Sequence, residues 1–176
     1  MRVRVALVLL ALAPAVTGAA DAIGPTDIAR VDEIIDAPRA LFGRTRAEIE
    51  RRLGAPVATE ARSLPRHTHP DLRDRVEDLA YAGVTLGVIA GAAGGSSPTG
   101  GSSPLRRVLV TGDGVPLPRA LTVGAERRRV EQVLGEPQEL TQARYLYLYA
   151  DGFPDTVEFF FRGDRVYRIE WNYSVQ

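Results

Sequence analysis

The sequence predicts an α+β protein of two degenerate repeats, each a short helix followed by a three-stranded antiparallel meander, with the helices packed on one face of the sheet. Two observations predict it. The stretch from Gly43 to Pro56 recurs without a gap from Gly124 to Pro137, 81 residues further along the chain. Each copy is followed by short runs of alternating or β-branched residues, which are typical of strands. Repetition at a fixed offset indicates that one structural unit is used twice.

The repeated stretch has the features of a short helix with a defined end. A glycine stands where the chain leaves the helix in a left-handed conformation, and a proline blocks its continuation. An arginine and a glutamate four residues apart predict an exposed ion pair along each helix. The matched pairs are Gly43 and Gly124, Arg46 and Arg127, Glu50 and Glu131, Leu53 and Leu134, Gly54 and Gly135, and Pro56 and Pro137.

A lead segment at 21–40 precedes the first copy. Its apolar residues, from Ile28 to Ile35, predict a short helix that ends at Asp36-Ala37-Pro38, because proline interrupts a helix. Thr45 and Glu48 then form a capping box at the start of the first repeated helix. Ile49 and Leu53, four residues apart, are its expected buried stripe.

Repeat 1 spans 41–117, and its expected strands are 76–81, 84–89 and 105–111. Residues 91–103, GAAGGSSPTGGSS, form a flexible glycine- and serine-rich linker. Repeat 2 spans 118–176, with Val130, Val133 and Leu134 on the buried stripe of its helix. Its expected strands are 145–149, 157–161 and 165–173.

The second repeat concentrates the aromatic residues, since ten of the twelve lie between Tyr145 and Tyr173. Tyrosine and tryptophan supply much of the binding energy where proteins meet, so this sheet is a candidate interface. The alternation of residues along these strands does not show which face of the sheet is exposed to solvent. The other interpretation is therefore a helix-covered core with tyrosines at its rim. The candidate partner-binding residues are Tyr145, Tyr147, Tyr149, Tyr167, Trp171 and Tyr173.

The chain begins with the features of a Sec-type signal peptide at 1–20. Arg2 and Arg4 precede an apolar run at 5–13 that is too short to span a membrane, and small residues follow it. The sequence contains no cysteine, so neither a lipoprotein anchor nor a disulfide is expected. We therefore expect a periplasmic or secreted protein without stable membrane insertion of the mature chain.

The composition narrows the function classes. The 22 basic and 22 acidic residues balance, which argues against nucleic acid as a partner. Catalysis needs a nucleophile, a tuned acid or base, or a metal, and the chain offers neither cysteine nor a G-x-S-x-G elbow. His67 and His69 could form half of a zinc site, but further ligands would have to come from elsewhere. We predict a non-enzymatic protein without metal or cofactor.

The pattern of glycine, short helix, Leu-Gly-x-Pro and β-meander, in tandem, resembles the β-lactamase-inhibitor-protein-like fold. Outer-membrane assembly lipoproteins of the SmpA/OmlA type share a single-copy version of this unit. The resemblance implies a protein whose sheet surface binds another envelope or secreted protein, in cell-envelope assembly or as an inhibitor. The alternative function is a binding module for a small envelope ligand, a lipid or glycan held between sheet and helices.

Overall fold

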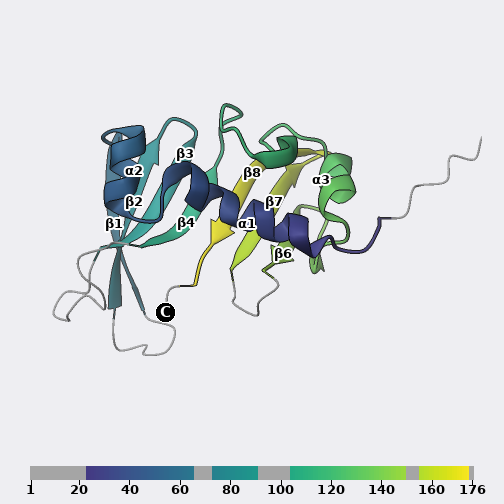
Figure 1. Ribbon diagram of the computed structural model, residues 1–176, viewed down its shortest axis with the longest axis horizontal. Coiled ribbons are helices and arrows are strands. Elements are labelled where there is room, and N and C mark those ends of the chain that lie inside the picture. The colour runs from purple at the N-terminus through teal and green to yellow at the C-terminus, as the bar shows by residue number, and fades with distance from the viewer. Residues whose placement is uncertain (1–22, 66–72, 91–103, 150–154, 175–176) are drawn as a thin grey trace, which may run out of the picture.

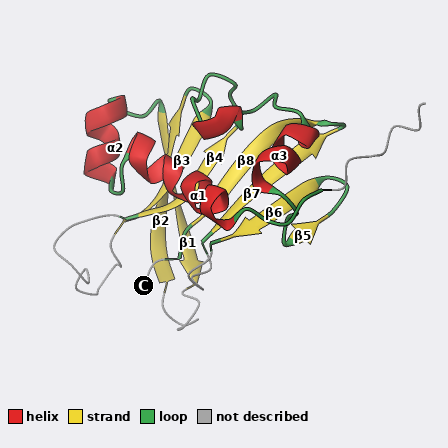
Figure 2. Ribbon diagram, turned by 45° about the vertical axis from the view of Figure 1, so that its right-hand side comes forward, coloured by secondary structure: helices red, strands yellow, loops and turns green. Residues whose placement is uncertain are grey.

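The computed structural model describes residues 23–65, 73–90, 104–149 and 155–174. The predicted signal peptide, the linker at 91–103, and His67 and His69 lie outside these ranges. Within them the protein is α+β, with three α-helices and one eight-stranded antiparallel sheet (Figures 1 and 2). The helices are α1 (Ile28–Phe42), α2 (Arg46–Leu53) and α3 (Arg127–Leu134), with a 3-10 turn η1 (Pro118–Ala120).

The sheet has the order β1-β2-β3-β4-β8-β7-β6-β5, so the last strands of the two halves, β4 and β8, meet at its centre. Figure 1 shows α1 crossing in front of the sheet, with α2 and α3 toward its two ends. The strands are β1 (Ala58–Pro65), β2 (Arg73–Tyr81), β3 (Val84–Ala90), β4 (Leu105–Val110), β5 (Glu139–Leu140), β6 (Arg144–Leu148), β7 (Thr156–Arg162) and β8 (Arg165–Asn172).

The six predicted strands are confirmed, but each half contains four strands and not three. The two strands not predicted from the sequence, β1 and β5, are the edges of the sheet. In β1 the residues from Ala58 to Ala61 are all exposed, and β5 is only two residues long with both side chains exposed. An edge strand that buries neither face lacks the hydrophobic alternation by which strands are recognised.

Helix α1 runs through Pro38, contrary to the expected end at Asp36-Ala37-Pro38. Proline has no N–H, so the carbonyl of Ile34, four residues earlier, loses its helical donor. The indole Nε1–H of Trp171 donates to that carbonyl at 2.9 Å and replaces the missing bond. The helix therefore continues because a residue of the last strand satisfies it.

Helix α2 begins as predicted, with the N–H of Glu48 donating to the hydroxyl of Thr45 at 3.3 Å. The carboxylate of Glu48 reaches one residue further back than a capping box requires and accepts from the N–H of Arg44 at 2.7 Å. Ile49 is fully buried, whereas Leu53 is 39% exposed. The predicted buried stripe of α2 is therefore a single residue.

Helix α3 buries Val130, Val133 and Leu134 as predicted, and no side chain caps its start at Glu126. Both repeated helices end as the motif predicts. Gly54 and Gly135 have φ of +80° and +75°, in the region that side chains other than glycine rarely adopt.

The predicted ion pair is present in α2, where Arg46 Nε and Glu50 Oε1 are 2.8 Å apart. In α3 the corresponding side chains have other contacts. The guanidinium of Arg127 lies 4.0 Å from the centre of the Phe161 ring, and Glu131 accepts from the hydroxyl of Tyr145. The two helices differ because Phe161 and Tyr145 contact the arginine and the glutamate of α3.

The core lies between α1 and one face of the sheet, here called the inner face, which carries Phe159, Ile169 and Trp171. All three side chains are fully buried. The opposite, outer face carries Phe160, Glu158 and Glu170, because neighbouring residues of a strand point to opposite sides. None of the described helices combines the length and the apolar character that a membrane span requires.

Candidate functional site

Four of the six predicted partner-binding residues lie in the core. Tyr145, Tyr147, Trp171 and Tyr173 are at most 3% exposed. The interpretation of a helix-covered core therefore describes these four side chains. A partner could reach them only if the helices moved away.

Each of the buried tyrosines uses its hydroxyl to hold a helix or a helix end. Tyr147 donates to the carbonyl of Gly135 at 3.0 Å, and Tyr173 donates to the carbonyl of Ile35 at 2.8 Å. Tyr145 donates to the carboxylate of Glu131. Burial raises the pKa of all three phenols, since a phenolate would lose its hydration there. These residues bind the sheet to the helices.

Tyr149 is half-buried at the end of β6, where its N–H donates to the carbonyl of Asp155 at 3.0 Å. Asp155 is itself buried. Its carboxylate forms an ion pair with Arg39 at 3.0 Å and accepts from the N–H of Ser174 at 2.7 Å. Tyr149 thus lies beside a cluster that holds the C-terminal segment to α1.

Tyr167 is the predicted residue that reaches the surface, since the residue is 39% exposed. Strict alternation along 165–173 would place Tyr167 on the same side of the strand as Ile169, Trp171 and Tyr173. In the structure Phe160 pairs with Arg168 and Phe161 with Val166, so Tyr167 is the extra residue of a β-bulge. A bulge shifts the alternation by one residue, and this moves Tyr167 away from the inner face.

Tyr167 is part of a cluster of aromatic and arginine side chains on the outer face, which we call the aromatic–arginine cluster: Phe160, Arg162, Tyr167 and Arg168. The rings of Phe160 and Tyr167 meet edge to face, with centres 6.5 Å apart. The guanidinium of Arg168 lies 3.7 Å from the centre of the Phe160 ring, and that of Arg162 lies 5.0 Å from the Tyr167 ring. Stacking of this kind holds flexible arginines in place while their edges remain free to donate.

A row of charged pairs crosses the outer face beside this cluster. Arg107 of β4 and Glu170 of β8 are 2.8 Å apart, and Arg144 of β6 and Glu158 of β7 are also 2.8 Å apart. Glu170 and Glu158 are mostly buried, with 14% and 13% of their side chains exposed. Paired charges on neighbouring strands make this part of the outer face polar and fixed in position.

Of this cluster only Tyr167 was predicted from the sequence, and Phe160, Arg162 and Arg168 were not. A signal was available, because Val157, Phe159 and Phe161 alternate along β7 and leave Phe160 with Glu158 on the other side. The exposure of Tyr167 had no comparable signal. It depends on the bulge, and nothing in the sequence of β8 marks one.

Metal binding finds no support among the residues that the structure describes, where no three acidic or histidine side chains gather. The histidines proposed as half of a zinc site lie in the undescribed range 66–72. What the described outer face offers is aromatic surface, guanidinium donors and fixed charge pairs. Groups of this kind are common where proteins bind one another.

Comparisons with known proteins return no match: no family model, no curated protein and no solved structure matches this chain. The candidate site therefore rests on the geometry of the chain itself.

Proposed function

We propose that this protein is a non-enzymatic binding protein that recognises a protein partner with the outer face of its sheet. The observation that carries the proposal is the aromatic–arginine cluster, in which Tyr167 is exposed beside Phe160 and Arg168. Tyrosine and arginine are enriched among residues that dominate binding energy at protein interfaces. The buried tyrosines of the second half are no longer part of the proposed surface.

The surroundings of the cluster favour a protein partner. The ion pairs between Arg107 and Glu170 and between Arg144 and Glu158 place fixed polar groups next to the exposed rings. Protein interfaces commonly have such a division, with an apolar centre and a polar rim. Since these charges are already paired across strands, binding need not order them again.

We further propose that the chain is built from two copies of one unit, with the helices on one face of the sheet. Equivalent hydrogen bonds support this. The N–H of Leu105 donates to the carbonyl of Arg44 at 2.7 Å, and the N–H of Val166 donates to that of Ala125 at 2.9 Å. The strand registers also correspond, including a bulge at Arg106 in β4 and at Tyr167 in β8.

The exits of the two repeated helices support the same proposal. Tyr81 of β2 donates its hydroxyl to the carbonyl of Gly54, and Tyr147 of β6 donates to that of Gly135. This arrangement agrees with the resemblance to the β-lactamase-inhibitor-protein-like fold and the SmpA/OmlA-type unit. The leader-like residues 1–20 then suggest that the partner is an envelope or secreted protein, met in cell-envelope assembly or through inhibition.

The experiment is affinity capture by the tagged chain 21–176 from the envelope fraction of its own source, followed by binding measurements with the isolated partner. We expect Tyr167→Ala and Phe160→Ala each to weaken that binding by about tenfold or more, which is a typical hot-spot effect. Ile28→Ala is the matched control, since Ile28 is 54% exposed but lies on α1. Equal affinity of all three variants and the parent chain would overturn the proposed surface.

A further inference from the structure

The two edges of the sheet differ sharply. At one end, β5 has only two residues, while at the other β1 has eight and pairs with β2 alone among the strands that the structure describes. Figure 1 shows β1 at the left-hand end of the sheet. A long edge exposes a row of backbone donors and acceptors that can pair with another strand. The edge of β1 is long enough for such pairing, and that of β5 is not.

Strand β1 is also accessible from both faces. Ala58, Thr59, Glu60, Ala61 and Ser63 are exposed, and Arg62 is half-buried. Since Ala58, Thr59, Ala61 and Ser63 are small, a neighbouring strand could approach closely along this part of β1.

Strand β1 and the facing residue Asp78 together carry two carboxylates but only one guanidinium. Glu60 lies directly across from Asp78 of β2, and like charges at this position repel. Arg62 forms an ion pair with the same Asp78 at 2.5 Å. This guanidinium is thus engaged by Asp78, and Glu60 would be stabilised by a further arginine on its free side.

We propose that β1 pairs antiparallel with β1 of a second copy of this chain, around a two-fold axis at Ala61. This register places Glu60 of each copy directly opposite Arg62 of the other, so one contact is made twice. It also places Thr59 opposite Ser63 and Ala61 opposite itself. A guanidinium has five N–H donors, so Arg62 can keep Asp78 while it binds the second copy's Glu60.

Neighbouring registers lack this match. An axis at Glu60 places the two Glu60 side chains opposite each other, and an axis at Arg62 does the same for the two arginines. Axes between residues place Glu60 and Arg62 opposite neutral side chains. Opposite charges on directly facing residues are within contact distance, so the register at Ala61 is the favoured one.

The decisive experiment is sedimentation velocity of the chain 21–176 over a range of concentrations. We expect a concentration-dependent dimer that weakens as salt is raised, because partly exposed ion pairs are screened. Glu60→Arg should weaken dimerisation by about tenfold or more, since two attractive pairs become two repulsive ones. The same change sets an arginine opposite Asp78, so it should not loosen β1 from β2.

The double variant Glu60→Arg/Arg62→Glu is the matched control. It exchanges the two charges and restores opposite pairs across the axis, so we expect the dimer to return. If the double variant remains as monomeric as Glu60→Arg, or the parent chain is monomeric throughout, the proposal is overturned.

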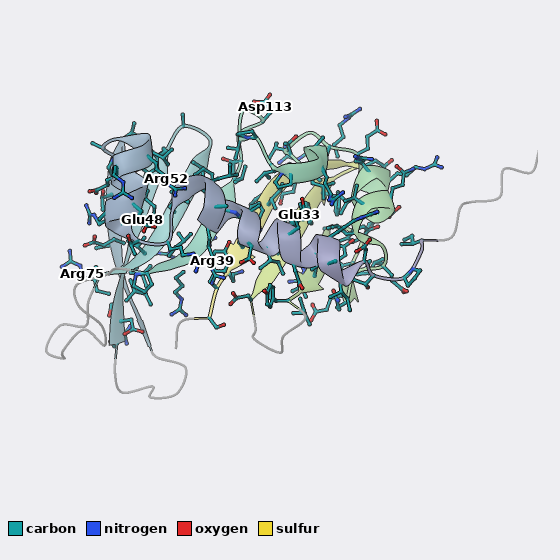
Figure 3. The ribbon with its side chains drawn as sticks, viewed as in Figure 1. Glu33, Arg39, Glu48, Arg52, Arg75 and Asp113 are labelled. Carbon is teal, nitrogen blue, oxygen red and sulfur yellow. The ribbon has the colours of Figure 1, made fainter. Side chains whose placement is uncertain are left out.

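An independent measurement uses the absence of natural cysteine. Facing residues in an antiparallel pair have Cα atoms about 4.5–5.5 Å apart, within the reach of a disulfide. Ala61→Cys should therefore cross-link into a covalent dimer under mild oxidation. Asp113→Cys, in an exposed loop far from β1 in Figure 3, should not. Equal cross-linking of the two variants would show random collision and would contradict the two-fold axis.

Discussion

The indole Nε1–H of Trp171 donates to the carbonyl of Ile34 at 2.9 Å, in place of the N–H that Pro38 lacks. This bond joins the last strand to the first helix, across 137 residues of sequence. Both atoms are buried, so neither could be satisfied by water. The bond explains why a proline is tolerated inside α1.

Trp171→Phe should destabilise the protein by about 1–3 kcal/mol, because it leaves the buried Ile34 carbonyl without a donor. Pro38→Ala supplies a backbone N–H that can form the ordinary helical bond to that carbonyl. In the Pro38→Ala background we therefore expect Trp171→Phe to cost less, by roughly 0.5–1.5 kcal/mol. Urea unfolding of the four chains measures this coupling, and strictly additive effects would contradict the replacement.

Two tyrosines of the second half should respond very differently to the same change. Tyr147→Ala removes a fully buried ring and its bond to Gly135, and we expect a loss of about 3–5 kcal/mol. Tyr167→Ala changes a residue that is 39% exposed, and we expect a change within about 1 kcal/mol. Thermal and urea unfolding test both, and similar losses would mean that Tyr167 belongs to the core.

The two helix-exit glycines offer a second matched pair. Both combine a positive φ with a ψ near −160°, a region that is essentially limited to glycine, so alanine at either position carries a backbone cost of about 1–3 kcal/mol. At Gly54 an added Cβ meets nothing within 4 Å, whereas at Gly135 it would lie 2.1 Å from the carbonyl oxygen of Pro25. Gly135→Ala should therefore be clearly the more destabilising, and we expect limited proteolysis to show a detached segment at Pro25. Equal unfolding midpoints would contradict this close packing.

Alkaline pH should unfold the protein through its buried tyrosines. Burial raises the pKa of Tyr147 and Tyr173 above the value of about 10 for an unfolded tyrosine. The folded state therefore favours the protonated phenols, and their contribution is complete below pH 10 and lost as pH rises above it. Absorbance at 295 nm and circular dichroism should show these tyrosines ionising together with unfolding. Ionisation of every tyrosine in a folded chain would contradict their burial.

The repeated helices and their ends could be predicted from the sequence because their signals are local. Thr45 caps the helix that begins beside it, and the glycines at positions 54 and 135 end helices at the next turn. Six strands were likewise visible as short β-branched or aromatic runs. The edge strands β1 and β5 were not, because exposed strands bury too little to show alternation.

Which residues form the candidate site depends on contacts between parts of the chain that are far apart in sequence. Alternation places Ile169, Trp171 and Tyr173 on one side of the chain, but it does not show which face the helices cover. The exposure of Tyr167 depends on a bulge in its pairing with β7, so only the assembled sheet revealed it.

The sequence by itself thus determined the α+β class, the repeated helix with its Gly-x-Pro exit, and the positions of most strands, since each depends on contacts within a few residues. The tertiary structure alone decided that Pro38 stays helical, that Tyr145, Tyr147, Trp171 and Tyr173 are core, and that Tyr167 reaches the surface. Each of those outcomes depends on a partner far away in the chain, and the propensities of neighbouring residues carry no record of it.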